Sequence, residues 1–152
     1  MSVISSIVLG FIAGAIATLT AYELLNWVFL THWTGWDSLT WNMAPAEYLT
    51  LPPLLNTALW GGLWGAIVGL ILGPRPRGLL TFRGALLGIV FPAVLGAFIL
   101  VPVITGRYPP FFGGDASQII PALCLMAAWG AVTAWVYGLF RFGHLPGFGA
   151  ND

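Results

Sequence analysis

The side chains of this 152-residue chain that could take part in catalysis are few, and their spacing does not favour it. His32, Asp37 and Ser38 share one stretch and have the residue types of a hydrolytic triad, but no nucleophile motif surrounds them. Cys124 is the only cysteine, so neither an intramolecular disulfide nor a thiolate metal site can form. The sequence also lacks a phosphate-binding loop and a basic patch suited to nucleic acid. We therefore expect no enzyme, no metal, no cofactor and no nucleic-acid partner.

Long apolar windows account for this shortage of reactive groups. Residues 1–22, 48–74, 84–106 and 116–140 carry no charged side chain. An α-helix needs about 20 mostly apolar residues to cross a bilayer, and a soluble chain of this length could not bury four such helices. The sequence predicts a single all-α domain over residues 1–152, an integral membrane four-helix bundle. The expected spans are approximately 3–29, 54–73, 84–105 and 118–140.

The composition supports the same class. The chain is 59% hydrophobic and 7% charged, and its mean hydropathy is +0.91. A soluble domain has about 25% charged residues, so this chain cannot build a surface that faces water on every side. The lipid bilayer is therefore its expected partner.

The arginines predict the orientation. Four of the five follow the second or the fourth span: Arg75, Arg77, Arg83 and Arg141. By the positive-inside rule these segments face the cytoplasm, and both termini do too. Arg107 is the exception, and Asp115 in the same loop is its expected ion-pair partner. Residues 1–10 contain no basic residue, so we interpret the first apolar window as a retained span rather than a cleaved signal.

This topology also bears on the histidines and on the 30–53 segment. His32 and His144 fall on opposite sides of the membrane and cannot hold a haem together, although His32 alone could ligate a pigment. Four aromatic residues of the 30–53 segment, Trp33, Trp36, Trp41 and Tyr48, favour the headgroup level of a bilayer. We expect the segment to lie in the outer interface or to fold back over the bundle.

Glycines recur at helical spacing in all four spans. The predicted packing positions are Gly10, Gly14, Gly61, Gly65, Gly69, Gly73, Gly84, Gly88, Gly130 and Gly138. Transmembrane helices associate where small residues at i and i+4 let backbones approach closely. These positions predict packing within the bundle; alternatively, the ridge of the second span contacts another subunit.

An internal repeat accompanies the glycines. Residues 64–68 (Trp-Gly-Ala-Ile-Val) match residues 129–133 (Trp-Gly-Ala-Val-Thr), and Gly10 and Gly14 resemble Gly84 and Gly88 in spacing. The pattern suggests two helical hairpins of like orientation, related by a pseudo-two-fold axis along the membrane normal. Pro92 falls near the middle of the third span and is expected to kink it.

One carboxylate lies inside a predicted span and suggests a site. Glu23 is about 30 Å along its helix from Val3, near the outer boundary of the membrane. A candidate pocket that opens outward would be lined by Glu23, Asn26, Asn56, Trp60 and Trp64. A structural role is the alternative, in which Glu23 is solvated at the interface or pairs with Arg107.

Two stretches resemble a known group of proteins. Residues 42–45 read Asn-Met-Ala-Pro, and residues 58–65 read Ala-Leu-Trp-Gly-Gly-Leu-Trp-Gly. The pattern resembles that of small uncharacterised bacterial inner-membrane proteins with four helices. Members of that group carry a His-Gln pair where this chain has Tyr22 and Glu23. The resemblance implies a non-enzymatic, multi-pass protein of the bacterial inner membrane.

Two functional hypotheses follow. In the first, the chain is a small structural or accessory subunit that packs against a larger membrane complex or against copies of itself. In the second, it is a small channel or transporter that uses Glu23 in an outward-facing pocket. The glycine ridges favour the first hypothesis and the intramembrane carboxylate favours the second.

Overall fold

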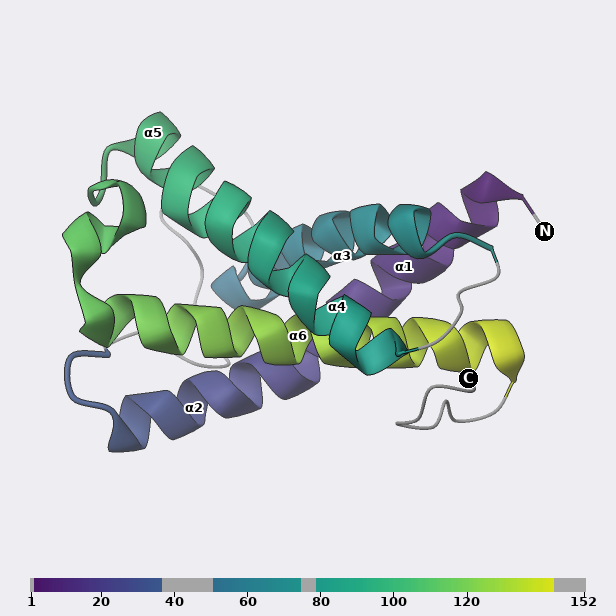
Figure 1. The fold of residues 1–152 in the computed structure, drawn as a ribbon, viewed down its shortest axis with the longest axis horizontal. Helices are drawn as coiled ribbons and strands as arrows, with labels where there is room; N and C mark the ends of the chain where they lie inside the picture. Colours follow the sequence, from purple (N-terminus) through teal and green to yellow (C-terminus); the bar gives the residue numbers. More distant parts are fainter. Residues whose placement is uncertain (1, 37–50, 75–78, 144–152) are drawn as a thin grey trace.

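The chain forms an all-α bundle, as the sequence predicts (Figure 1). The computed structural model describes residues 2–36, 51–74 and 79–143. Four helical stretches in these ranges are long and apolar enough to cross a membrane: Val3–His32, Pro53–Leu72, Leu80–Thr105 and Ala116–Phe142. The predictions for Asp37, Ser38, Trp41, Asn42–Pro45, Tyr48, Arg75, Arg77 and His144 lie outside the described residues.

Span 1 consists of three consecutive segments. Helix α1 (Val3–Ala17) continues through a π-helical turn, η1 (Thr18–Tyr22), into α2 (Glu23–His32). Ser2 caps α1, because its hydroxyl oxygen accepts a hydrogen bond from the Ser5 N–H. The π turn displaces the following helix, so that α1 packs on α3 while α2 lies beside α6.

Span 2 is the single helix α3 (Pro53–Leu72). Pro53 occupies its first position, where the missing N–H is not needed for a helical hydrogen bond. Gly73 ends the helix with φ 74°, and nothing lies within 4 Å of the position that a Cβ on it would take. Gly73 is therefore a helix terminator, and its Cβ position does not pack against another described helix as predicted for the bundle.

Span 3 begins four residues earlier than predicted and is the least regular. Helix α4 (Leu80–Gly88) leads into a long π-helical stretch, η2 (Ile89–Leu100), and then α5 (Val101–Thr105). Leu80 is buried, which explains why the helix starts before the apolar window. Pro92 lies inside η2, whose wider turns accommodate a residue that has no N–H to donate.

Span 4 is α6 (Ala116–Phe142), which follows a short turn, η3 (Pro110–Gly114). Asp115 caps α6: one carboxylate oxygen accepts from the Ser117 N–H at 2.9 Å and from the Ser117 hydroxyl at 2.7 Å. This cap moves the start of the helix two residues ahead of the prediction. Gly143 ends α6 with φ 70°.

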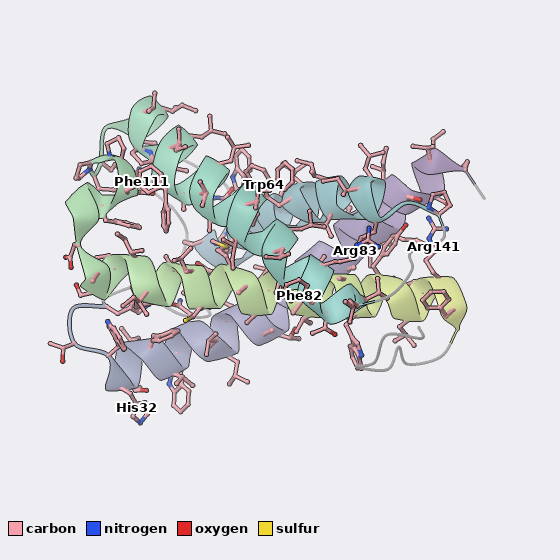
Figure 2. The ribbon with its side chains drawn as sticks, in the orientation of Figure 1. His32, Trp64, Phe82, Arg83, Phe111 and Arg141 are labelled. Atoms are coloured by element: carbon pink, nitrogen blue, oxygen red, sulfur yellow. The ribbon has the colours of Figure 1, made fainter. Side chains whose placement is uncertain are left out.

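The two ends of the bundle can be told apart by their loops. We call the end that holds Val3, Leu72 and Phe142 the terminal end, and the end that holds His32, Pro53 and the 106–115 loop the loop end. Figure 2 labels Arg83 and Arg141 at the terminal end and His32 and Phe111 at the loop end. The start of α1 and the end of α6 lie at the same end of the bundle (Figure 1).

Glycines join consecutive spans at two seams. In the first seam, α1 meets α3: a Cβ on Gly10 would lie 2.9 Å from Gly69 Cα, and one on Gly14 would lie 2.7 Å from Gly65 Cα. In the second seam, α4 meets α6: a Cβ on Gly130 would lie 2.8 Å from Gly88 Cα. Real Cβ atoms do not approach other atoms so closely, so both seams require glycine.

The remaining predicted glycines fit the same picture. Gly61 lies against Thr18 and the Gly14 backbone in the first seam, and Gly84 lies against the Gly130 carbonyl in the second. Gly138 is buried on α6. The ridge of span 2 thus packs inside the chain, against α1.

The two seams have the same register. Gly10 and Gly14 correspond to Gly84 and Gly88, and the partners Gly61, Gly65 and Gly69 correspond to Met126, Gly130 and Ala134. This is the correspondence that the matching Trp-Gly-Ala segments predict. The π-helical turns also correspond, since Thr18 aligns with Pro92 and Tyr22 aligns with Gly96. The hairpins are therefore alike in contacts as well as in sequence.

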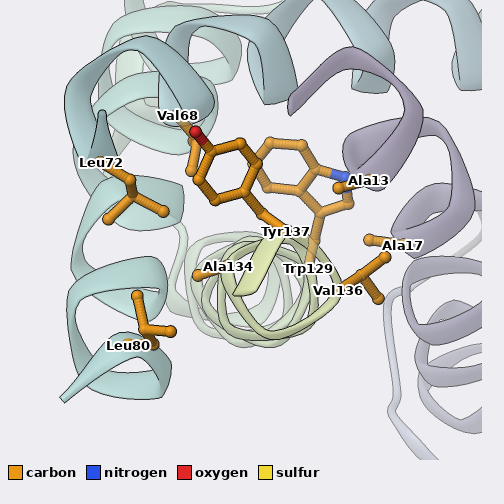
Figure 3. Packing of buried hydrophobic residues seen from close by; sticks show 9 residues of the cluster. All are labelled: Ala13, Ala17, Val68, Leu72, Leu80, Trp129, Ala134, Val136 and Tyr137. Carbon is orange, nitrogen blue, oxygen red and sulfur yellow. The ribbon is translucent and has the colours of Figure 1, made fainter. Parts of the chain in front are cut away.

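The buried core lies between α6 and the other three spans (Figure 3). Trp129 and Tyr137 point from α6 into the space between α1 and α3, where Ala13, Ala17 and Val68 surround them. Leu80 of α4 closes the cluster on the other side of α6. Small residues on α1 make room for the two large rings of α6.

The first seam generates a stability prediction. Gly65→Ala should lower the free energy of unfolding in detergent by about 1–3 kcal/mol, because the new Cβ would meet the Gly10 carbonyl and Gly14 Cα, both backbone atoms. Leu70→Ala is the matched control, since Leu70 is 50% exposed on the same helix. Thermal unfolding in one detergent measures both. Equal stability of the two variants would show that the seam does not hold the hairpin together.

Candidate functional site

An apolar pocket of about 310 Å³ lies between α3 and the loop-end half of span 3. Its wall includes Tyr22, Trp60, Trp64, Pro92, Gly96 and Trp129. The volume is at the lower end of the range of roughly 300–1,000 Å³ for ligand pockets. Aromatic rings and aliphatic side chains form most of the wall, which suits a hydrocarbon group.

The pocket exists because spans 2 and 3 separate beyond the seams. Helix α3 packs mainly on α1, whereas η2, apart from the adjoining α4 and α5, packs on α6 and on η3 of the 106–115 loop. The Trp64 ring bridges part of the gap: its Cζ2 lies 3.0 Å from where a Cβ on Gly96 would be. Gly96 therefore makes room for the indole, and the space beside it remains open.

The structure divides the predicted candidate pocket in two. Trp60 and Trp64 line the apolar pocket, whereas Glu23, Asn26 and Asn56 are not among its lining residues. Glu23 is only 4% exposed and Asn26 only 1%, and both lie on the buried side of α2. Asn56 is half-buried in the first turn of α3. The five predicted residues thus do not form one site.

Asn26 belongs to a polar contact with the chain that follows span 1. The Trp36 indole N–H donates to Asn26 Oδ1 at 2.7 Å, and the Trp33 indole N–H donates to the Ser117 carbonyl at 2.9 Å. The Gln118 side-chain amide also donates to the Gly35 carbonyl. Residues 33–36, the described part that follows α2, therefore fold back onto α2 and the start of α6, and the prediction for residues 37–50 lies outside the described residues.

Trp129 forms the central polar contact of the bundle. Its indole N–H donates to the Gly14 carbonyl at 3.1 Å and to the Thr18 hydroxyl oxygen at 3.0 Å. The Thr18 hydroxyl in turn donates to the Gly14 carbonyl at 2.9 Å. Trp129 is only 2% exposed, so these bonds tie α6 to span 1 in the interior of the bundle.

Trp64, which corresponds to Trp129 in the repeat, has a different environment. Its N–H has no hydrogen-bond partner among the residues that the structure describes. The position equivalent to Thr18 is Pro92, which offers no hydroxyl, and the position equivalent to Tyr22 is Gly96, which offers no ring. Trp64 thus lacks the hydroxyl partner that Trp129 has, and Pro92 and Gly96 line the open pocket beside it.

Arg141 makes a second polar contact, at the terminal end. Its guanidinium donates to the Ser5 hydroxyl at 3.1 Å, the Ser6 hydroxyl at 2.5 Å and the Tyr137 hydroxyl at 3.0 Å. The Tyr137 hydroxyl then donates to the Gly73 carbonyl at 2.7 Å. One arginine thereby connects α6 to α1 and to the end of α3, a role that the sequence analysis missed.

The 106–115 loop is packed by its aromatic residues. The rings of Tyr108 and Phe112 stack with centroids 4.7 Å apart, and Phe98 of η2 contacts both Phe111 and Phe112. The Tyr108 hydroxyl donates to the Ala97 carbonyl at 2.9 Å. Partial burial raises the pKa of Tyr108, so the phenol stays a neutral donor at physiological pH.

Arg107 in this loop is exposed, and the predicted ion pairs do not form. Asp115 uses its carboxylate to cap α6, and the side chain of Arg107 forms no ion pair with Asp115, Glu23 or any other described residue. The capping competes with ion pairing because Ser117 lies two residues away and supplies both donors. Only the backbone N–H of Arg107 is bonded, to the Thr105 hydroxyl.

The described residues contain no group of three or more His, Cys, Asp or Glu side chains that could hold a metal ion. Comparisons with protein-family models, with curated proteins and with solved structures gave no significant match. The function must therefore be argued from the arrangement of the residues. That arrangement offers an apolar binding surface and polar contacts that join the helices.

The two equivalent tryptophans generate a matched prediction. Trp129→Phe keeps an aromatic ring but removes both hydrogen bonds to span 1, so it should lower the free energy of unfolding by about 1 kcal/mol. Trp64→Phe removes an N–H that bonds to no described residue and should change stability less. Thermal unfolding in detergent compares the variants. A larger loss for Trp64→Phe would contradict the assigned role of Trp129.

Proposed function

We propose that the protein is a small, non-catalytic membrane protein that acts as an accessory subunit of a larger membrane complex or as a homo-oligomer. The observation that carries the proposal is that both glycine seams, Trp129 and Arg141 are engaged inside the chain. The bundle is thus a self-contained body, and many large apolar side chains of its described spans face outward. A partner would contact these outward faces and not the ridge of span 2.

The orientation belongs to the same proposal. The protein resides in a bacterial inner membrane, with both termini in the cytoplasm. The support comes from the arginine asymmetry, together with the position of Arg83 and Arg141 at the terminal end. The loop end then faces outward.

Reporter fusions test the orientation. A reporter that is active only outside the cytoplasm should work when fused after Gly113 and should fail when fused after Arg141. A fusion after Thr34 is the second positive control, because residues 33–36 lie at the same end as the 106–115 loop. Activity after Arg141 would place the terminal end outside and refute the proposed orientation.

Purification from native membranes tests the accessory function. The tagged full-length chain, extracted in mild detergent, should co-purify with stoichiometric membrane partners or with further copies of itself. The matched control is Gly65→Ala, which should weaken the chain's own fold and reduce recovery of partner and chain together. A stable monomer that purifies alone from its native membrane would overturn the proposal.

A channel or transporter remains the second candidate, because Glu23 is a carboxylate buried within span 1. A coupling carboxylate must change protonation or bind a cation, so Glu23→Gln would abolish flux in proteoliposomes and leave folding intact. We expect no flux from the unaltered protein. We also expect the stability effects of Glu23→Gln and Arg107→Gln to add, since the side chain of Arg107 does not pair with Glu23.

A further inference from the structure

The inference begins with Arg107, the arginine that departs from the positive-inside pattern. It is exposed at the loop end directly after α5, where Gly106 adopts φ 64° and ends the helix. No described carboxylate pairs with its side chain, because Asp115 caps α6. A cation at a membrane interface that has no carboxylate partner among the described residues attracts the anionic groups that lie at that level, which are lipid phosphates.

The apolar pocket extends along span 3 toward the loop that carries Arg107. Ala97, Leu100, Val101 and Ile104 all line the pocket, and they succeed one another along η2 and α5 up to the loop. From Gly96 to Arg107 the helix covers roughly 15 Å. That length is about half of the 30 Å hydrocarbon core, the depth of one leaflet.

The apolar wall of the pocket indicates which part of a ligand would enter it. The hydroxyl of Thr18 donates to the Gly14 carbonyl and that of Thr57 donates to the Pro53 carbonyl, so both are already bonded. Trp60, which is 56% exposed, stands at the lipid side of the pocket. The wall therefore suits a hydrocarbon chain that enters sideways from the bilayer.

We propose that the pocket and Arg107 form one binding site for an anionic phospholipid of the loop-end leaflet. The lipid phosphate would bind the Arg107 guanidinium, and one acyl chain would descend along α5 and fill the space beside Trp64 and Gly96. A zwitterionic lipid brings its own cation, which competes with the arginine for the phosphate, so the site prefers a net anion. The pocket volume of about 310 Å³ suits a single unbranched chain.

The site is tested by native mass spectrometry of the full-length protein in detergent. Phosphatidylglycerol and phosphatidylcholine with identical chains are titrated separately, and the bound fractions are compared. The unaltered protein should prefer phosphatidylglycerol. Arg107→Gln should lower the affinity for phosphatidylglycerol roughly tenfold, as expected for the loss of a charged hydrogen bond. It should also remove the preference for phosphatidylglycerol over phosphatidylcholine. Arg107→Lys should retain part of it.

A second variant tests the chain-binding part. Ala97→Phe places a ring in the pocket and should lower the affinity for both lipids equally. Thermal unfolding checks that this variant still folds. If Ala97→Phe does not fold, Leu100→Trp, at a 40% exposed position of the same wall, replaces it. Unchanged lipid preference in Arg107→Gln, or unchanged binding in the pocket variant, would overturn the proposal. Binding of a polyprenyl phosphate in place of phosphatidylglycerol would overturn the phospholipid assignment.

Discussion

Close contact between polypeptide backbones at the two glycine seams is the constraint on which the rest of the structure depends. Helices in a bilayer gain little from burying apolar side chains, because the lipid tails are equally apolar, so they depend on close packing. At Gly10 and Gly65, and again at Gly84 and Gly130, the backbone of one helix occupies the space of a missing Cβ. Each seam therefore fixes the relative height and rotation of its two helices. The polar contacts of α6 depend on that geometry, because they join residues of different helices.

The two hairpins share the geometry of the glycine seams and differ in the side chains that surround their equivalent tryptophans. Thr18 supplies a hydroxyl oxygen that completes the Trp129 contact, whereas Pro92 at the equivalent position supplies none. One hairpin thus contributes to a sealed polar contact, and the other leaves Trp64 beside an open space. The two seams have the same register, so the backbone around Trp64 resembles that around Trp129. The different surroundings of the two tryptophans therefore come from the neighbouring side chains.

The sequence predicted most of the fold, because a bilayer selects helices by length and apolar composition, and both are visible in the residue order. Glycine spacing predicted the seams, and the repeat predicted their common register. The site was less predictable. Glu23 and Asn26 were placed in a pocket by depth alone, but the direction in which a side chain faces depends on helix rotation. The bonds of Arg141 to Ser5 and Ser6 likewise depend on which spans become neighbours, and no local pattern encodes that.

The contacts of α6 also bear on the order in which the bundle can be assembled. Each glycine seam joins spans that follow one another in the chain, so the first hairpin can close while the rest of the protein is still being synthesised from the N-terminus. Trp129 and Arg141, however, belong to the last span to enter the membrane, and both reach back to the first. Until α6 arrives, span 1 lacks the partners that hold it to the second hairpin. The insertion of α6 thus completes the second hairpin and at the same time joins it to the first.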